Sequence, residues 1–433
     1  MQGIILMLGI SFLILISYYI SGNDLLSPSV ILEVCYLVSV AVMLMSWEVK
    51  YNWNTVGIIL LGLVSFQFTE ALFYMQRSKN RKQKMAVIDV SKAVLFLVII
   101  IQIIVVILYA REIMRIGRAG LLESMKIVRR QNMYSASLET SQYIKFYISR
   151  IMKFNYAAAY VNLYIFLNNS MLTGKIRGNE IYLFSIIIYI MQAFLSGGRQ
   201  QFLRISLAAI IIVLLNDRRR SDWKSKISIK IMVKLMLFLI IIIIAFYSIR
   251  VIIGRTSQVN DTLWDMFSVY FSGGLLGFNT YMENPIRNTG NLIGSQTFKD
   301  LFNLLYKFDF FSTRIIPQLE FRKVGNQLTN TYTAFRYYYQ DFGIQGIVIM
   351  QVIFSFIFNE VYLRIKKHGD SRMIPIYSFL FFALVMHVIL DQFFSILSIG
   401  FIETIIEIFI LYWIESHIAV RIRTRKIPTM RME

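Results

Sequence analysis

Apolar runs of roughly 17 to 25 residues recur from one end of the chain to the other, separated by shorter polar segments. Each run is long enough to cross a hydrocarbon core about 30 Å thick as an α-helix, which satisfies every backbone polar group internally. The pattern predicts an all-α, polytopic transmembrane helix bundle of about 11 helices, within a range of roughly 10–12. The expected spans are residues 3–20, 29–46, 56–75, 93–110, 154–170, 181–196, 201–215, 231–253, 343–363, 374–391 and 396–414.

The short basic segments set the expected orientation, because Lys and Arg are enriched in cytoplasmic loops. Segments 77–92, 217–230, 364–372 and the basic tail all fall on one side under strict alternation. That side is predicted to be the cytoplasm, with the N-terminus outside and the C-terminus inside. The basic stretch 111–153 departs from this rule, and we expect either amphipathic helices at the interface or a missed or re-entrant helix there.

Residues 254–342 form the one long segment without a spanning signal, and alternation places it outside the cytoplasm. The sequence therefore divides into N-terminal transmembrane helices (1–253), an extracytoplasmic loop (254–342), and C-terminal transmembrane helices with a cytoplasmic tail (343–433), all within one membrane domain. Short amphipathic pieces at 263–276 and 297–305 predict that this large loop is a small helical cap.

Composition supports the membrane interpretation: 57% of the residues are hydrophobic, 16% are charged and the mean hydropathy is +0.58. The formal net charge of +20 could suggest nucleic acid. Because the basic residues cluster between apolar runs, we interpret the charge as a topology signal and expect no nucleic-acid partner. A single cysteine, Cys35, excludes an intramolecular disulfide, and the three histidines show no metal-ligand spacing.

Two arginine-bearing turns are candidate anion sites at the outer membrane interface. The first is SGGRQQ at residues 196–201, where Arg199 and Gln200 follow paired glycines. The second is the end of the eighth predicted helix, with Arg250 in its last turns and Arg255 just beyond it. The alternative for both turns is a snorkelling arginine without a binding function.

A third candidate is the aromatic run from Asn330 to Gly343. If the run is helical, one face carries Tyr332, Arg336 and Gln340, and another carries Thr333, Tyr337 and Asp341. Tyrosine rings with a few polar groups suit sugars, Arg336 suits an anion, and Asp341 is the most plausible general base. An interfacial aromatic belt with a charged anchor is the alternative interpretation.

Several polar side chains fall inside the predicted spans, where they either take part in function or bridge helices. They are Glu33, Glu70, Asn162, Gln192, His387, Asp391, Glu403 and Glu407. His387 and Asp391 lie four residues apart and could orient each other. The chain has no Walker loop, GxSxG elbow or DxD-like cluster, which argues against an ATPase, a serine hydrolase and a cytoplasmic nucleotide-sugar transferase.

The order of these motifs resembles the bacterial oligosaccharide repeat-unit polymerases, the Wzy-type polymerases of O-antigen and capsule synthesis. The motifs are LLSPSV (25–30), SGGRQQFL (196–203), GRTS (254–257), GSQTF (294–298) and NTYTAFRYYYQDFGIQG (330–346). The spaced arginine and glycine motifs of some members have no clean counterpart in this chain.

The resemblance implies a GT-C-like bundle in the bacterial cytoplasmic (inner) membrane that polymerises undecaprenyl-diphosphate-linked oligosaccharides at the outer face. It implies no cofactor and no metal, and it implies the lipid bilayer, a chain-length regulator and a flippase as further partners. The expected catalytic residues are Asp341 as the base and Arg336 and Arg199 as diphosphate ligands. The expected substrate-binding residues are Arg255, Arg250, Tyr332, Tyr337, Tyr338, Gln200 and Asn330.

Three other functions remain open from the sequence. A lipid-linked oligosaccharide flippase or other transporter should carry its polar residues near the bilayer midplane on broken, repeated helices. An O-antigen ligase would use the same chemistry with another acceptor. A scaffold protein would leave the outward arginines without a function.

Overall fold

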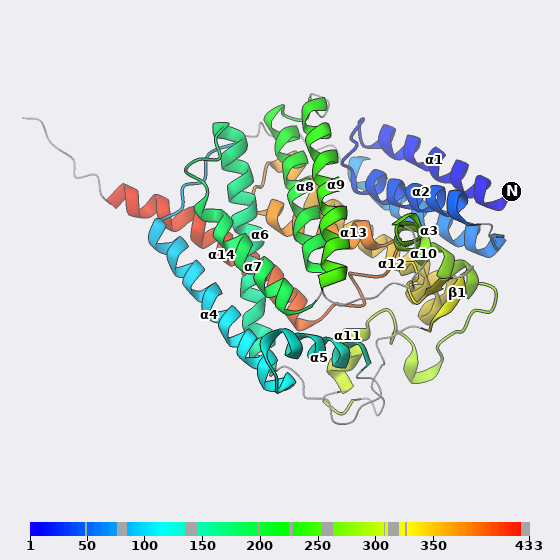
Figure 1. Cartoon of the computed structure of the whole chain (residues 1–433). Helices are drawn as coiled ribbons and strands as arrows, with labels where there is room; N and C mark the ends of the chain where they lie inside the picture. Colours follow the sequence, from blue (N-terminus) through cyan, green and yellow to red (C-terminus); the bar gives the residue numbers. More distant parts are fainter. Residues whose placement is uncertain are drawn as a thin grey trace, which may run out of the picture. The chain divides into compact units, whose positions relative to one another are not determined.

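The computed structural model describes residues 1–47, 50–75, 85–134, 145–197, 200–224, 228–252, 263–306, 308–310, 320–324 and 327–425. The described chain is almost entirely α-helical (Figure 1). It forms two compact units, each assembled from separated stretches of sequence. Unit 1 comprises Met1–Asn80, Thr256–Lys367 and Leu380–Ser398, and unit 2 comprises Arg81–Arg255, His368–Phe379 and Ile399–Glu433.

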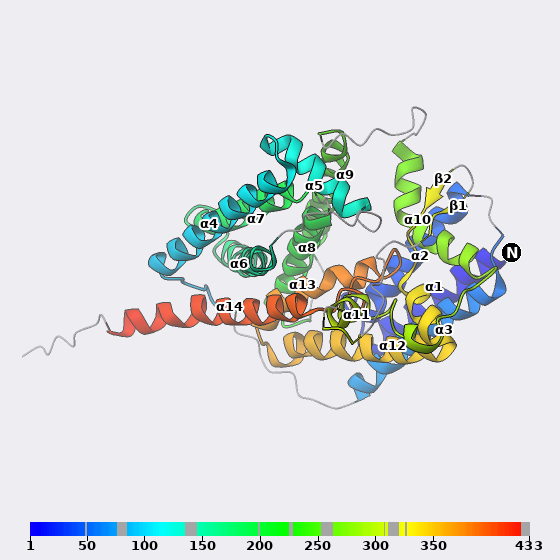
Figure 2. The ribbon, with the colours of Figure 1, turned by 90° about the horizontal axis from the view of Figure 1, so that it is seen from below.

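Unit 1 combines three N-terminal helices with most of the segment that was predicted to be a loop. Its elements are α1 (Gln2–Ile20), α2 (Pro28–Ser46), α3 (Trp53–Met75), α10 (Leu263–Tyr281), the 3-10 helix η1 (Gly290–Leu292), α11 (Lys299–Tyr306), β1 (Arg322–Val324), β2 (Gln327–Thr329) and α12 (Ala334–His368). The strands β1 and β2 pair antiparallel and lie beside α10 in both ribbon views (Figure 2). This hairpin was not predicted from the sequence, because each strand is only three residues long.

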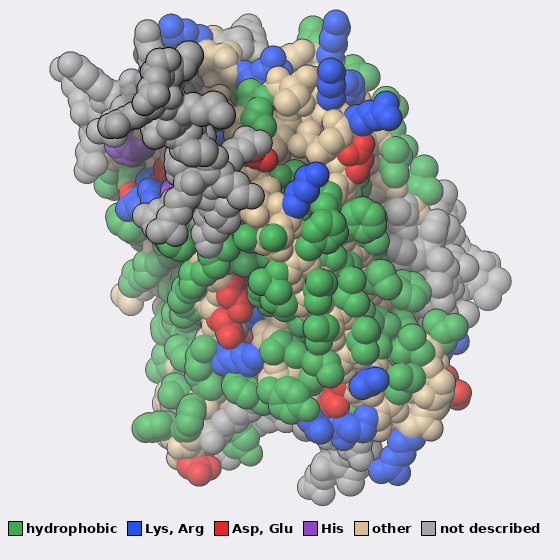
Figure 3. Space-filling view, turned by 90° about the vertical axis from the view of Figure 1, so that its left-hand side faces the viewer, with side chains coloured by type: hydrophobic (Ala, Val, Ile, Leu, Met, Phe, Trp, Pro, Cys, Tyr) green, Lys and Arg blue, Asp and Glu red, His purple; other side chains and the backbone are tan. Residues whose placement is uncertain are grey.

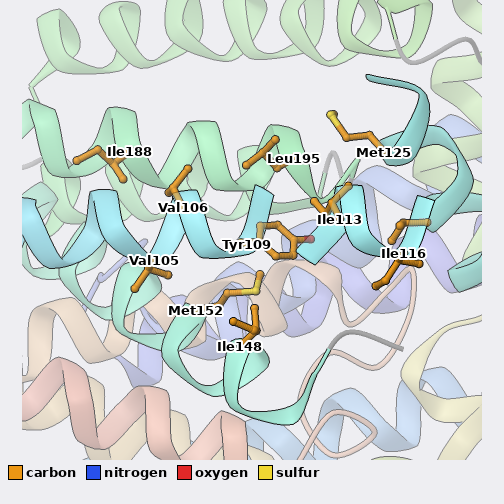
Figure 4. Packing of buried hydrophobic residues seen from close by; sticks show 11 residues of the cluster. Val105, Val106, Tyr109, Ile113, Ile116, Met125, Ile148, Met152, Ile188 and Leu195 are labelled. Atoms are coloured by element: carbon orange, nitrogen blue, oxygen red, sulfur yellow. The ribbon is translucent and has the colours of Figure 1, made fainter. Parts of the chain in front are cut away.

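Unit 2 is a helix bundle built around α6 (Phe146–Thr173). Its other elements are α4 (Lys92–Gly117), α5 (Leu121–Tyr134), α7 (Ile181–Leu195), α8 (Gln200–Arg220), α9 (Ile229–Ile252) and α14 (Ile399–Arg425). The helix α6 packs against α4, α7, α8 and α14. Buried side chains such as Val106, Tyr109, Met152 and Leu195 interdigitate between α4, α6 and α7 (Figure 4). The remaining helix, α13 (Met373–Met386), contributes to both units.

Each of the eleven predicted spans overlaps a helix of the structure, so the predicted all-helical class is confirmed. Within the described part of the chain, six helices are long and apolar enough to cross a membrane: α1, α2, α3, α4, α8 and α12. Hydrophobic side chains also cover much of one face of the molecule, with most Lys and Arg towards its upper and lower margins (Figure 3). These features are consistent with a polytopic membrane protein.

The amphipathic segments were also located correctly. The pieces expected at 263–276 and 297–305 correspond to α10 and α11, and the basic stretch 111–153 contains α5 between the ends of α4 and α6. The LLSPSV motif starts α2: Ser27 caps the helix by accepting a hydrogen bond from the Val30 amide, and Pro28 occupies the first turn, where its missing N–H costs nothing.

Most of the intramembrane polar residues bridge helices of their own unit, as the structural alternative predicted. The Ser17 hydroxyl donates to Glu33 (2.8 Å), the Ser29 amide to Glu70 (2.8 Å), Asn162 to Glu415 (3.3 Å) and Asn155 to Gln192 (2.7 Å). Arg150 pairs with Glu403 between α6 and α14. By contrast, the pairing of His387 with Asp391 that the four-residue spacing allowed is not formed. His387 contacts Tyr36 (2.9 Å) and Gln351 (2.6 Å), whereas Asp391 accepts three backbone N–H bonds from residues 393–395.

A glycine in α10 allows the chain before α12 to lie directly on that helix. A Cβ at Gly277 would be 2.3 Å from the carbonyl oxygen of Thr331, which no side chain could tolerate. Nearby, the Thr333 amide donates to the carbonyl of Gly274 (3.1 Å). This close approach places Tyr332 next to Tyr281, the last residue of α10.

The helix α12 consists of two helical parts joined at Gly343, whose φ of 67° is accessible mainly to glycine. A Cβ at this position would be 2.5 Å from the Arg287 guanidinium. The joint therefore separates the short first part, which carries the aromatic run, from the long apolar part.

We expect the close approach at Gly277 to dominate the stability of this region. Gly277→Ala should destabilise the protein by about 1–3 kcal/mol, because the new methyl group displaces a backbone segment. Gly57→Ala is the matched control, since a Cβ there has no neighbour within 4 Å. Thermal unfolding in detergent should show a lower Tm for the first variant only; equal Tm values would contradict the packing described above.

Candidate functional site

Arg336 is the centre of the charged cluster in unit 1. It lies in the first turns of α12 and is only 2% exposed. Its guanidinium lies against two tyrosine rings, 3.9 Å from the ring centre of Tyr332 and 4.5 Å from that of Tyr281. The two rings are nearly perpendicular, with an interplanar angle of 79°, so they contact the cation from two different sides. Contacts of this kind are worth about 0.5–2 kcal/mol each, more when desolvated.

Among the described residues, one guanidinium nitrogen of Arg336 has a hydrogen-bond partner and the other two have none. Its Nη2 donates to Glu320 Oε2 at 2.6 Å and lies 3.5 Å from Gln340 Oε1. Its Nε and Nη1 are buried and have no hydrogen-bond partner among the described residues. An unsatisfied buried donor costs about 1–3 kcal/mol, and more when it is charged, so such groups call for an explanation. A permanent cation with two unused donors is suited to an anionic ligand.

Glu320 lies between two arginines. Its Oε2 contacts Arg336, its Oε1 lies 3.4 Å from Arg322 Nη2, and its side chain is 40% exposed. The Tyr332 hydroxyl holds the backbone by donating to the Glu320 carbonyl at 2.9 Å. Partial burial acts to raise the pKa of Glu320, but the hydrogen bond and charge of Arg336, aided by Arg322, outweigh it. The pKa therefore stays below its ordinary value of 4.5.

Two further arginines make the cluster positive. Arg322 donates to the Thr280 carbonyl (2.9 Å) and lies over the Tyr281 ring (5.8 Å). Arg287 lies over Tyr339 at 5.4 Å, beside the joint of α12. Arg336 and Arg322 thus share one carboxylate, Glu320, and Arg287 adds a third positive charge near Tyr281, a balance that favours a negatively charged ligand.

Asp341, the predicted base, holds the GSQTF motif against α12. It is 3% exposed, and both of its oxygens accept hydrogen bonds. Asn288 donates to Oδ1 (2.6 Å), while the amides of Gln296 (3.1 Å) and Thr297 (2.6 Å) donate to Oδ2. These contacts give Asp341 an anchoring role, and its role as a base stays a prediction.

A polar chain links this anchor to the arginine. Gln340 Nε2 donates to Asn288 Oδ1 at 3.2 Å, and the backbone N–H of Asn288 donates to the backbone carbonyl of Gln340 at 2.8 Å. Asn288 therefore connects Asp341 with Gln340, which in turn faces Arg336. The structure thus brings Tyr332, Arg336 and Gln340 together, although only Arg336 and Gln340 are helical, since Tyr332 precedes α12.

The other predicted ligands in this run lie elsewhere in unit 1. Tyr338 packs in the interior against His387 and Phe394, with ring centres 6.1 Å and 5.7 Å away. Tyr337 is also buried, and its carbonyl accepts a hydrogen bond from the Thr297 hydroxyl. Asn330 is half-buried between β2 and α12.

Unit 2 contains a second group of charges where α6, α8 and α14 begin. Lys153 lies over the Tyr156 ring (5.4 Å), and Gly400 leaves room for it, since a Cβ there would be 3.1 Å from Lys153 Cε. Gln200 is the half-buried first residue of α8, and Arg204 lies one turn further on, within electrostatic range of Lys153. Arg199, Arg255 and the side chain of Arg250 lie outside the part of the chain that the structure describes, so their predicted roles are untested.

Four members of the unit 1 cluster were missed from the sequence: Tyr281, Arg287, Glu320 and Arg322. They come from the end of α10 and from segments without helical periodicity, so no spacing rule connects them with Arg336. Among the described residues, no group of three or more His, Cys, Asp or Glu side chains could hold a metal ion.

The fold and cluster together define a helical protein of membrane type with an arginine site lined by tyrosines. Over 114 residues the chain is 28% identical to an O-antigen polymerase of Shigella dysenteriae, a match that covers 25% of this chain and 28% of that relative. No family model matches the chain. No solved structure matches it either.

The contacts of Asp341 predict a local effect on the neighbouring segment. Asp341→Ala removes three hydrogen bonds to a charged group, each worth about 1.5–3 kcal/mol. Trypsin should then cleave after the exposed Arg287 at least about tenfold faster, because residues 288–297 lose their attachment. Glu360→Ala, which removes an exposed carboxylate from the same helix, should leave the rate unchanged. An unaltered rate in Asp341→Ala would refute the anchoring role.

The lowered pKa of Glu320 sets a pH dependence for its ion pair. A depressed pKa means that the pair contributes stability above the unfolded value of about 4.5 and loses it as the pH falls through the lower folded value. Glu320→Gln should lower the Tm by about 1–2 °C, equally at pH 6 and pH 8, with the difference shrinking only below about pH 4.5. A difference that changed between pH 6 and pH 8 would show that Glu320 titrates there, contrary to this expectation.

Proposed function

We propose that this protein polymerises undecaprenyl-diphosphate-linked oligosaccharide repeat units into a bacterial surface polysaccharide at the outer face of the cytoplasmic membrane. The observation that carries this proposal is the buried Arg336 guanidinium, which lies against the rings of Tyr281 and Tyr332 and has two nitrogens without a hydrogen-bond partner among the described residues. The partial similarity to an O-antigen polymerase supports the same class of chemistry.

The reaction places two demands on the protein. The bond between C1 of the growing glycan and its diphosphate breaks, a new bond forms from C1 to a hydroxyl of the incoming repeat unit, and that hydroxyl loses a proton. Undecaprenyl diphosphate leaves with the electrons of the broken bond, so neither a nucleotide nor a metal is required by the chemical balance. The protein must therefore stabilise a departing diphosphate and accept one proton.

Arg336 meets the first demand. A guanidinium keeps its charge at any physiological pH and can bind phosphate oxygens with two donors. Its burial excludes water, which strengthens its interaction with charge that develops on the leaving group. The two tyrosine rings contact the guanidinium before the substrate arrives, so little reorganisation is needed during the reaction.

The second demand falls on Asp341 in our proposal. For Asp341 to accept a proton, one of its oxygens must first become free of its hydrogen bonds, either the one from Asn288 or those from the backbone amides of residues 296–297. Tyr339, Gln340 and Asn288 lie next to it and supply an aromatic face and amide groups of the type that bind sugars. Arg199 and Arg255 remain proposed diphosphate ligands.

The proposed partners are those that the family resemblance implies: undecaprenyl-diphosphate-linked oligosaccharides in the bilayer, a flippase that delivers them and a chain-length regulator. A ligase would use the same leaving group, and a flippase would bind the same headgroup without transfer. A null strain distinguishes a polymerase from a ligase. Single lipid-linked repeat units accumulate when a polymerase is missing, whereas long lipid-linked chains accumulate when a ligase is missing.

The proposal predicts a large effect at Arg336. The protein in nanodiscs, given the lipid-linked repeat unit of its host, should form a ladder of lipid-linked oligomers without nucleotide sugar or ATP. Arg336→Ala should lower the initial rate by at least about 100-fold. Arg336→Lys keeps the charge but loses the parallel N–H donors of the planar guanidinium, so it should lower the rate by roughly 10- to 100-fold.

Arg364→Ala is the control, because it removes an exposed arginine from the same helix. Its rate should match that of the unmodified protein, and the Tm of each variant shows whether it is folded. A folded Arg336→Ala variant that elongates at the normal rate would exclude this site.

A further inference from the structure

We propose that Glu320 is a built-in placeholder for a phosphate group at Arg336 and thereby determines which lipid headgroups occupy the site. This inference rests on the proposed function, because it takes the headgroup of the lipid carrier as the ligand of Arg336. It adds a role in setting the occupancy of the site for a residue outside the motifs that the sequence singled out.

The first argument is geometric. Glu320 Oε2 lies 2.6 Å from Nη2 of Arg336, which is the distance of a strong charge-assisted hydrogen bond. Glu320 engages this one nitrogen only, while Nε and Nη1 are buried without partners in the described chain. A phosphate oxygen pair in its place could engage Nη2 together with a second nitrogen. The ligand would thus satisfy a donor that the carboxylate leaves unsatisfied.

The second argument concerns access. Arg336 is 2% exposed, whereas the side chain of its partner Glu320 is 40% exposed. In the conformation seen here an anion cannot reach Nη2 while Glu320 is in place, so Glu320 must leave as the ligand binds. Arg322 provides an alternative partner for the displaced carboxylate, since it already lies 3.4 Å from Oε1.

The third argument is thermodynamic. A contact that must open before binding raises the apparent dissociation constant of every ligand by the same factor. In a bilayer the abundant competitors are phosphodiester headgroups with one negative charge, which interact weakly with Arg336. The placeholder keeps these lipids from occupying the site at their natural concentration, while a diphosphate, with more charge, still displaces Glu320. The ratio of the two affinities is unchanged, but the common penalty moves the weak ligand below half-saturation at its natural concentration while the tight ligand still fills the site.

The test uses the full-length protein in nanodiscs of phosphatidylcholine. Two probes are titrated separately: farnesyl diphosphate for the carrier headgroup and a short-chain phosphatidylglycerol for the phosphodiester class. Glu320→Gln should bind both probes roughly tenfold more tightly than the unmodified protein, by the same factor for each. Glu283→Gln, which removes an exposed carboxylate just beyond α10, should bind both with unchanged affinity.

Glu320→Asp is a second variant in case the amide disturbs folding. It keeps the charge but shortens the side chain by one methylene, so it should also tighten binding of both probes. Unchanged or weaker binding in both variants, with Arg336→Ala still abolishing the binding of farnesyl diphosphate, would overturn the placeholder and leave the proposed function standing. Binding of farnesyl diphosphate that is equally tight in Arg336→Ala would overturn the proposed function and the placeholder together.

Discussion

A permanently charged guanidinium inside a protein must be compensated, and the arrangement of unit 1 is organised around this requirement at Arg336. Two tyrosine faces, one carboxylate and one amide surround the cation, and they come from α10, from the segment before β1 and from α12. Contacts elsewhere in unit 1 hold the surroundings of Arg336 in place. The glycines of α10 admit the chain next to Tyr332, and Asp341 holds residues 288–297 in place.

The compensation of Arg336 is incomplete among the described residues. The Asp391 carboxylate accepts three backbone N–H bonds, whereas two buried nitrogens of Arg336 have no hydrogen-bond partner in the described chain. Carboxylates that bridge helices, such as Glu33 and Glu70, also keep one oxygen without such a partner. What distinguishes Arg336 in our proposal is a permanent positive charge together with spare donors, which suits an anion.

The sequence predicted the parts of this protein that depend on local periodicity. Apolar length located the helices, and helical spacing grouped Arg336 with Gln340 in the first turns of α12, whereas Tyr332 precedes the helix and reaches Arg336 through its ring. Tyr281 and Glu320 could not be found in this way, since they reach Arg336 through tertiary packing and lie 55 and 16 positions before it in the numbering. The pairing of His387 with Asp391 failed for a related reason: an i, i+4 rule applies within a helix, and α13 ends before either residue.

The left-handed residue at Gly343 also has a mechanical consequence. It divides α12 into a short part that holds the site and a long apolar part, and these two parts are not one rigid rod. Bilayers differ in thickness, and long apolar helices adapt by changing their tilt. Because the two parts meet at one left-handed residue, the direction of the long apolar part in a bilayer does not by itself fix the orientation of the short part that carries Arg336.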